Sequence, residues 1–242
     1  MEIGCGDGRI LAECAAINPQ LSQTGIDLRQ KNNQWQTHRA RWDGETWIGD
    51  DFLVAEPVLL VAIEWLDDVP ATVATVNPAG QPVALGPTGD TAALSPADQR
   101  WLARWWPGLA PWERAVIGRS RDRAWQWFAQ RLAPGSLLVS IDYGHTAARR
   151  PSDGGLTAHA AGAQVIPGVG VNVTAGVAID SLATTVEATG AQRLWRERLR
   201  NLPDGFWPHP DGVLARLAHR SQEALLRAPH RFGDFWLVAH RL

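Results

Sequence analysis

Residues 1–8 read Met-Glu-Ile-Gly-Cys-Gly-Asp-Gly, and the apolar residues that follow recur at helical spacing. The alternate glycines Gly4, Gly6 and Gly8 can adopt the positive φ angles of a tight turn and let a ligand approach the backbone closely. A helix that begins after such a turn offers unpaired amide groups to polar ligand atoms. The stretch therefore predicts a short strand, a ligand-binding turn and a helix. Because a strand usually takes about five or six residues, we expect the natural gene start to lie upstream of Met1.

Strand and helix patterns alternate after the glycine turn. A short strand over 24–28 contains Asp27, and the β-branched run over 58–63 is typical of a buried parallel strand. The other predicted elements are a helix over 29–37, a third strand at 47–48, a strand over 136–142, helices over 178–188 and 211–227, and a final strand over 235–239. This alternation predicts an α/β fold built on a parallel sheet.

The middle of the chain departs from this alternation. Two short apolar segments flank residues 77–80, Asn-Pro-Ala-Gly, whose composition is typical of a hairpin turn. A helix that begins with Ser95 as its cap follows, and a second helix is predicted over 111–132. We therefore expect one domain over 1–242, with an insertion of a hairpin and helices at about 71–134.

The acids around the glycine turn indicate which ligand it holds. Asp27 lies 27 − 8 = 19 residues after Gly8, a distance at which an acid commonly accepts hydrogen bonds from ribose hydroxyls. Glu2 before the turn and Asp7 within it suit a cationic ligand, such as the sulfonium and amino groups of S-adenosylmethionine. A dinucleotide-binding turn would have a glycine where Arg9 stands. S-adenosylmethionine is the favoured ligand, and a dinucleotide or a plain turn without a ligand are the alternatives.

Further acids follow the later strands. Asp50 and Asp51 come after the predicted third strand, where Asp50 could accept a hydrogen bond from an adenine amino group. Glu64 and Asp67 follow the fourth strand, and ligands bind at the carboxyl ends of strands in open α/β sheets. These two carboxylates suit a cationic methyl acceptor such as a guanidinium and can take the proton lost on methylation. The alternative is a solvated loop. Tyr143 either lines the acceptor pocket or simply packs there.

Composition argues against several classes of function. The 242 residues carry 23 basic and 25 acidic side chains, a net charge of −2, which gives nucleic-acid binding no support. Lys31 is the only lysine, so P-loop and Schiff-base mechanisms have no lysine in place. The two cysteines, Cys5 and Cys14, fit a reducing cytoplasm. The histidines show no metal-binding spacing, and no apolar run is long enough to span a membrane. We expect a cytoplasmic protein with no metal site.

Four motifs, in this order, resemble the MidA-like methyltransferases, a family that includes the mitochondrial complex I assembly factor that methylates a protein arginine. The first is the glycine motif that begins at Glu2, and the second is Asp27 with Leu28 and the helix start that follows them. The third falls on 62–70, which ends at a proline, and the fourth is Ile-Asp-Tyr-Gly-His over 141–145. The resemblance covers most of the chain.

The resemblance implies a Rossmann-like class I methyltransferase fold, with a mostly parallel seven-stranded sheet and an antiparallel C-terminal strand. It implies S-adenosylmethionine as the cofactor and a protein arginine as the methyl acceptor. The residues assigned to the cofactor are Glu2, Gly4, Cys5, Gly6, Gly8, Asp27, Leu28, Asp50, Asp51 and Ala62, and those assigned to catalysis are Glu64, Asp67 and Tyr143.

The sequence also departs from the family pattern. Ile63 stands where the family has an asparagine, and the stretch 172–178 lacks a histidine and an acid of the family motif. In the family a further segment usually precedes the glycine strand and helps to cover the cofactor, and we expect that this chain lacks it. Two alternatives therefore stay open: a small-molecule N- or O-methyltransferase, and a non-catalytic assembly factor that keeps the fold.

Overall fold

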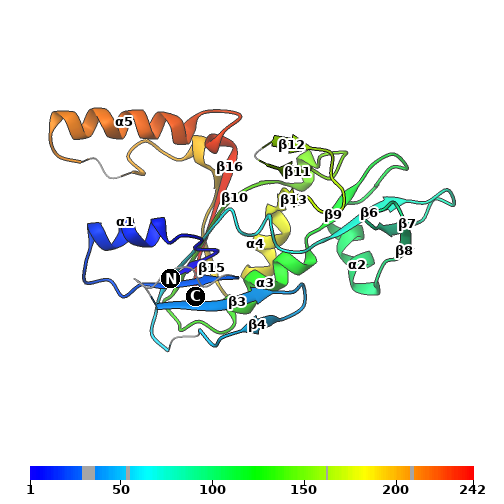
Figure 1. Ribbon diagram of the computed structural model, residues 1–242, viewed down its shortest axis with the longest axis horizontal. Helices are drawn as coiled ribbons and strands as arrows, with labels where there is room; N and C mark the ends of the chain where they lie inside the picture. The colour runs from blue at the N-terminus through cyan, green and yellow to red at the C-terminus, as the bar shows by residue number, and fades with distance from the viewer. Residues whose placement is uncertain (29–35, 53–54, 162, 208–209) are drawn as a thin grey trace.

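A central sheet of nine strands organises the residues that this computed structural model describes, 1–28, 36–52, 55–161, 163–207 and 210–242 (Figure 1). In order of hydrogen-bonded neighbours the strands are β15 (Gln192–Arg198), β16 (Phe235–Arg241), β10 (Leu137–His145), β5 (Leu59–Ile63), β1 (Glu2–Ile3), β2 (Thr24–Asp27), β3 (Gln36–Trp42) and β4 (Trp47–Gly49), and β14 (Val177–Ala178) pairs with β10. The ladder is parallel from β3 to β10, whereas β16 runs antiparallel to β10 and to β15. The predicted parallel sheet and its antiparallel C-terminal strand are confirmed, but the sheet has nine strands instead of the seven expected, because the short strands β4 and β14 pair with β3 and β10.

Helices cover both faces of the sheet. Successive side chains along a strand point to opposite faces, so neighbouring residues of one strand pack in different clusters. Leu138 of β10 packs in one core with Trp125 of α3 (Arg119–Ala129) and Leu182 of α4 (Ile179–Glu187). Its neighbour Val139 packs on the other face, in a cluster with Leu237. On that side lie α1 (Arg9–Ile17) and α5 (Val213–Arg227) (Figure 1). The two helices predicted near the C-terminus are confirmed as α4 and α5.

A second, four-stranded antiparallel sheet stands beside the central one (Figure 1). Its order is β8 (Thr91–Ala93), β7 (Pro82–Leu85), β6 (Thr72–Val76) and β9 (Ala115–Ile117), so the predicted hairpin is confirmed as β6 and β7. The helix α2 (Pro96–Trp105) packs on this sheet, and the hydroxyl of Ser95 accepts the Asp98 N–H at 3.1 Å, as its capping role predicts.

The end of the insertion differs from the prediction. Residues 115–117 form strand β9 rather than part of a helix, because this apolar run is fully buried against β6. The helix α3 begins only after Gly118, and its residues Trp125 and Phe128 belong to the core of the central sheet. The inserted sheet therefore ends at β9, whereas the sequence placed the end of the insertion at about residue 134.

A third sheet occupies the stretch after β10 that the sequence left unassigned. It is antiparallel and three-stranded, in the order β12 (Ala163–Val165), β11 (Leu156–Ala160) and β13 (Asn172–Ala175). Short 3₁₀ turns, η1 (Ala147–Arg149), η2 (Leu199–Asn201) and η3 (Phe232–Asp234), complete the described elements.

The third parallel strand is β3, and the prediction of that strand at 47–48 is wrong. Residues 47–48 belong instead to β4, an edge strand antiparallel to β3. β3 is rich in polar residues and so lacks an apolar run, yet Ala40 and Trp42 are buried, and Arg39 and Arg41, which alternate with them, are exposed. Most of the helix predicted over 29–37 lies outside the described residues, and its last two residues belong to β3.

An aromatic cluster joins the edge of the sheet to α3. The rings of Trp47 and Trp65 are stacked, with centroids 5.7 Å apart and planes 10° apart. Trp42, Phe52 and Trp127 pack around Trp47 at centroid distances of 5.9, 5.2 and 5.9 Å. Trp65 belongs to the loop that follows β5, so the cluster fixes this loop against β4 and α3.

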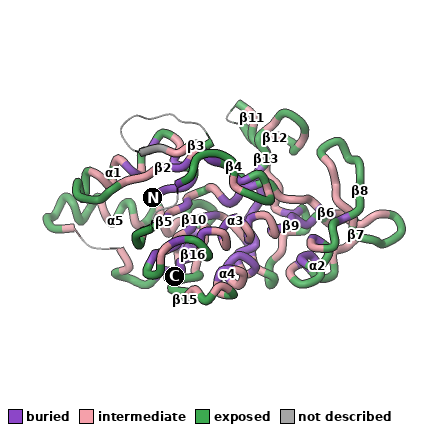
Figure 2. The backbone as a smooth tube through the Cα atoms, turned by 90° about the horizontal axis from the view of Figure 1, so that it is seen from below, coloured by how far each residue is buried: buried purple, intermediate pink, exposed green. Residues whose placement is uncertain are grey.

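Burial is uneven across the molecule. Figure 2 shows buried stretches in α3 and α4, whereas α5 is mostly exposed. No residue of α5 is buried, and Leu214, Leu217 and Leu225 are each more than half exposed.

Candidate functional site

The glycine turn joins β1 to α1 at the carboxyl edge of the sheet. Gly4, Gly6 and Gly8 have φ angles of 70°, 54° and 76°, the left-handed region that glycine adopts without a steric penalty. The Gly4 N–H donates to the Ile26 carbonyl at 2.8 Å. The Gly6 N–H donates to Asp27 Oδ2 at 2.9 Å, so the structure brings the predicted acid of β2 onto the turn.

The glycines of the turn differ in what surrounds them. A Cβ on Gly4 would lie 2.9 Å from Cδ1 of Trp65, so this position has no room for a side chain. A Cβ on Gly6 would meet no atom within 4 Å. Trp65 therefore packs against the turn at Gly4. The backbone at Gly6 is open, so a ligand can approach it there.

Two predicted cofactor residues point into the protein rather than toward the open side. Glu2 is 5% exposed and lines a cavity of about 610 Å³ between α1 and β5. Burial raises the pKa of Glu2 to about 7, while the nearby N-terminal ammonium opposes this shift. Cys5 is buried beside Gly25, and burial raises the pKa of its thiol to about 11. A cofactor contact by either side chain stays a prediction.

The acids that follow the next strands gather at the same edge. Asp50 Oδ2 accepts the Arg39 N–H at 2.7 Å, and Arg39 is the register partner of Asp27 on β3. Asp50 therefore lies beside β3, the strand next to that of Asp27. The predicted hydrogen bond between an adenine and Asp50 stays a prediction. Asp51 and Leu28 are exposed neighbours of these acids.

Glu64 stands at the carboxyl end of β5 in a strained conformation. Its φ angle is 48°, which is uncommon for a residue with a side chain. Its N–H donates to the Ile141 carbonyl at 3.0 Å, so it continues the parallel pairing with β10, and its side chain is exposed. Such strain persists where the surrounding structure enforces it and is concentrated at functional sites. Ala62, two residues earlier, is buried in the main core.

A buried polar network lies behind Glu64. Asp142 Oδ2 accepts the N–H groups of Leu66 and Asp67 at 3.0 and 3.3 Å. Burial, with a further contribution from Asp68, raises the pKa of Asp67 to about 6, although Arg121 opposes the shift. Burial also raises the pKa of Asp142 well above its usual value. A carboxyl group with a pKa near 6 is well suited to accept a proton at neutral pH.

Arg121 of α3 holds this network in place. It is 2% exposed and donates to four backbone carbonyls, those of Asp67 (2.6 Å), Val69 (3.3 Å), Ala175 (2.9 Å) and Gly176 (3.2 Å). Neither Arg121 nor Asp142 is among the site residues predicted from the sequence. Asp142 lies inside the motif at 141–145, which was a usable signal, whereas nothing marks Arg121 among the other arginines of the chain.

Tyr143 lies on β10 near Asp67. Its hydroxyl donates to Thr174 Oγ1 at 2.6 Å, and burial raises its pKa although that hydrogen bond opposes the shift. Asp142, which accepts the Asp67 N–H, directly precedes Tyr143 on β10, so the structure brings Tyr143 close to Asp67. Glu64 acts electrostatically on Asp67. The three predicted catalytic residues thus form one group at the carboxyl ends of β5 and β10.

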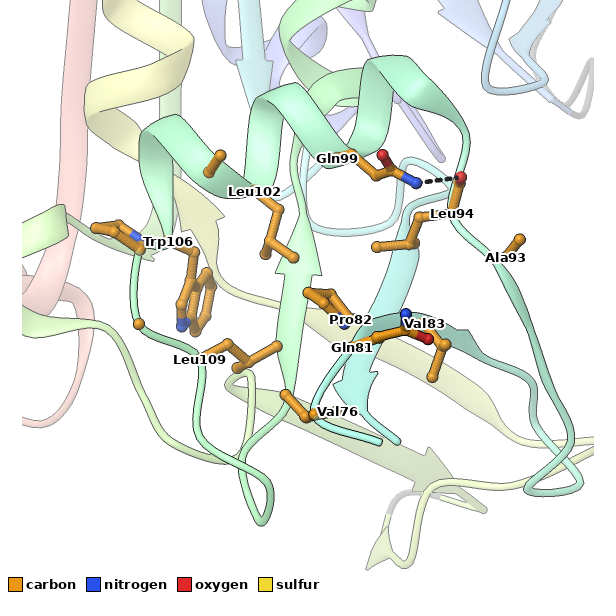
Figure 3. Close-up of a pocket in the computed structure, with 14 residues that line it drawn as sticks. Val76, Gln81, Pro82, Val83, Ala93, Leu94, Gln99, Leu102, Trp106 and Leu109 are labelled. Carbon is orange, nitrogen blue, oxygen red and sulfur yellow. Dashed lines mark hydrogen bonds between the residues drawn. The ribbon is translucent and has the colours of Figure 1, made fainter. Parts of the chain in front are cut away.

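A separate cavity of about 560 Å³ lies in the inserted sheet. Figure 3 shows Leu102, Trp106 and Leu109 around Val76 and Pro82, and the Gln99 side chain donating to the Leu94 carbonyl, at 3.1 Å. No charged side chain lines this cavity among the described residues. It therefore offers packing surface rather than groups for acid–base chemistry.

Two features are absent from the described ranges, a metal-ion cluster and a membrane-spanning helix. Within them, no group of three or more His, Cys, Asp or Glu residues could hold a metal ion. In the same part of the chain, no helix has the length and apolar character to cross a bilayer.

Comparisons with known proteins bear on the fold. The sequence matches no protein-family model and no curated protein. The structure is similar to two crystal structures from Burkholderia thailandensis. One is a COG1565 superfamily member and likely methyl transferase bound to S-adenosyl-homocysteine, with a TM-score of 0.68 and 18% identity over 100% of this chain and 70% of that one. The other is an uncharacterized ACR, COG1565 superfamily protein, with a TM-score of 0.70 and 18% identity over 100% of this chain and 73% of that one.

The likeness extends through the whole chain at low sequence identity, so it concerns the fold. The central sheet, with β1 in its middle, a parallel ladder to β10 and an antiparallel β16, is the Rossmann-like sheet of class I methyltransferases. The fold expected from the sequence is confirmed.

Proposed function

We propose that this chain is an S-adenosylmethionine-dependent methyltransferase whose cofactor lies over the glycine turn between β1 and α1. One observation supports the proposal most directly. Asp27 Oδ2 accepts the Gly6 N–H at 2.9 Å, and this N–H belongs to a turn of three glycines with positive φ angles that is open at Gly6. The COG1565 protein of the same fold, bound to S-adenosyl-homocysteine, supports this proposal.

The residues at this edge fit such a cofactor. Open backbone at Gly6 gives close access to a bulky ligand, and Asp27 stands at the end of β2, where an acid can accept ribose hydroxyls. Asp50, one strand further, can accept an adenine amino group. When bound, the cofactor supplies an electrophilic methyl group on its sulfonium.

The group at the ends of β5 and β10 suits a protein arginine as the methyl acceptor. The exposed carboxylate of Glu64 can bind a guanidinium through two parallel hydrogen bonds. Asp67, whose pKa burial raises to about 6, can accept the proton that the acceptor nitrogen loses. Arg121 and Asp142 hold the loop of Asp67 so that these groups keep their positions, and positioning supplies most of the rate in such a transfer.

A calorimetric titration of S-adenosyl-homocysteine into the whole chain tests the cofactor. We expect micromolar binding, a loss of at least tenfold in Asp27→Ala, and no change in Asp43→Ala. Asp43 is the matched control, because its carboxylate also accepts backbone N–H groups, at 2.9 Å, in an exposed turn. Absence of binding by the unaltered chain would overturn the proposal and favour the non-catalytic alternative.

The acceptor is tested separately once cofactor binding is established. Transfer of a labelled methyl group to an arginine-containing peptide, but not to small amines, is the expected result. Transfer to small amines or hydroxyl compounds alone would replace the arginine acceptor with a small molecule, which the apolar Ile63 at the end of β5 would favour.

A further inference from the structure

A second opening lies at the carboxyl end of β10, on the side away from the glycine turn. It is a cavity of about 470 Å³ whose lining includes Tyr143, His145, Arg149, Arg150, Gly176 and Arg198. Tyr143 belongs both to this cavity and to the group around Asp67, so the cavity adjoins the proposed site of methyl transfer. The glycine turn is separated from it by β5, which lies between β1 and β10.

Hydrogen bonding fixes the protonation of His145. Nη1 of Arg150 lies 2.6 Å from Nδ1 of His145, and a guanidinium can only donate, so Nδ1 accepts. Burial and the adjacent Arg150 lower the pKa of His145 to about 3, which keeps the ring neutral. The single ring proton is therefore on Nε2. Within the described residues this buried Nε2–H has no hydrogen-bond partner, and His145 is 6% exposed.

The charges around the cavity do not balance. Arg150 pairs with Asp180 at 2.7 Å, and Arg198 pairs with Asp234 at 3.1 Å. Asp234 is shared with Arg200, and Arg149 has no ion-pair partner in the part of the chain that the structure describes. Three guanidinium groups therefore face two carboxylates, and one of those also serves a fourth guanidinium.

Trp106 packs against two of the residues that line the cavity, His145 and Arg150. Its ring meets His145 edge-on at 5.2 Å, and the guanidinium of Arg150 stands 5.4 Å above its face. The indole is 4% exposed, so Arg150 and His145 are held in fixed orientations before any ligand arrives. Preorganised donors of this kind bind an anion without a further ordering cost.

We propose that this cavity binds an anionic group, a carboxylate or a phosphate, carried by the methyl acceptor. The guanidinium groups that line it are donors only, so their complement is a group with several acceptor oxygens. That the anion is carried by the methyl acceptor rests on the proposed function, whereas the anion site rests on the cavity alone. An arginine acceptor would then present an acidic group beside the guanidinium that Glu64 holds.

Long-range ¹⁵N–¹H spectra of the histidine rings test the anion site on the whole chain without cofactor. The His145 signals are assigned by their loss in His145→Gln. At neutral pH we expect them to show the Nε2–H tautomer and to shift with inorganic phosphate, until saturation, against sodium chloride of equal ionic strength. In Arg149→Ala the phosphate concentration for half-saturation should rise at least fivefold, and in Arg216→Ala, an exposed arginine of α5, it should not change.

Acetate in place of phosphate distinguishes the two anions. A larger response to acetate assigns a carboxylate, and a larger response to phosphate assigns a phosphorylated acceptor. An Nδ1–H tautomer, an absent shift, or an unchanged half-saturation concentration in Arg149→Ala would overturn the anion site. S-adenosyl-homocysteine titrated into the same samples separates the two proposals: a protein that binds phosphate but no S-adenosyl-homocysteine keeps the anion site and loses the methyltransferase.

Discussion

Gly6 can be replaced at little cost in packing, yet it stands where a cofactor would approach. Ala at a φ angle of 54° costs about 1–2 kcal/mol of stability, and no atom lies within 4 Å of the new Cβ. Gly80 in the β6–β7 hairpin is a matched control, with a φ angle of 79° and equally open surroundings. We expect Gly6→Ala and Gly80→Ala to lose similar stability in urea denaturation, and only Gly6→Ala to weaken S-adenosyl-homocysteine binding, by at least tenfold. Equal binding by both variants would place the cofactor elsewhere.

The backbone strain at Glu64 makes a different prediction. Gly relieves about 1–2 kcal/mol of left-handed strain but costs about 0.5–1 kcal/mol in unfolded-state entropy. We therefore expect Glu64→Gly to raise the free energy of unfolding by about 0.5 kcal/mol and to abolish methyl transfer to an arginine peptide. Ala161→Gly, at a φ angle of 49°, should gain similar stability and keep the activity. A less stable Glu64→Gly variant would show that side-chain contacts, rather than function, maintain this conformation.

At the scale of elements, Asp122 links three helices. It lies on α3 and accepts the indole N–H of Trp101 of α2 at 2.7 Å and the hydroxyl of Ser181 of α4. Burial raises the pKa of Asp122 to about 7, although both hydrogen bonds oppose the shift. The folded state therefore binds a proton that the unfolded state has released, and this contribution to stability is lost as the pH rises from about 4 to about 7.

The contribution of Asp122 to the pH dependence of stability can be isolated with Asp122→Asn. The side-chain amide oxygen of this variant can still accept the hydrogen bonds from Trp101 and Ser181. Relative to this variant, the unaltered chain should lose about 1.4 kcal/mol of unfolding free energy for each pH unit within that window. Buried His145 and His240 oppose this slope, because their lowered pKa values make stability rise with pH, but they act equally in both proteins. Parallel pH profiles of the two proteins in urea denaturation would contradict the prediction.

Elements with an apolar signature could be predicted from the sequence, and those whose burial comes from their neighbours could not. β5 and β16 carry apolar runs, and α2 carries a cap, so each was found near its observed place. β3 was missed because polar residues interrupt any apolar run in its sequence, although Ala40 and Trp42 are buried. The turn with Asp27 followed from local spacing, whereas Arg121 reaches carbonyls more than 50 residues away and leaves no local pattern.

At the scale of the whole molecule, stability should be concentrated around α3 and α4. Both helices lie in the main core, whereas α5 contacts the rest of the chain mainly through η2 and η3 and buries none of its residues. Regions with few buried contacts open locally at low free energy. In hydrogen–deuterium exchange we expect the amides of α5 to exchange at least about 100-fold faster than those of α3. Equal protection would mean that α5 opens only with the whole fold.

The stacked indoles of Trp47 and Trp65 also make the molecule optically informative. Two ring systems 5.7 Å apart share their electronic excitation, and a chiral arrangement of such rings gives a signed pair of bands in circular dichroism. Trp65 also packs against Gly4. The sign and size of this signal therefore depend on the position of the glycine turn relative to Trp65. The protein thus carries a chromophore that reports, without any label, whether the glycine turn packs against the loop of Trp65.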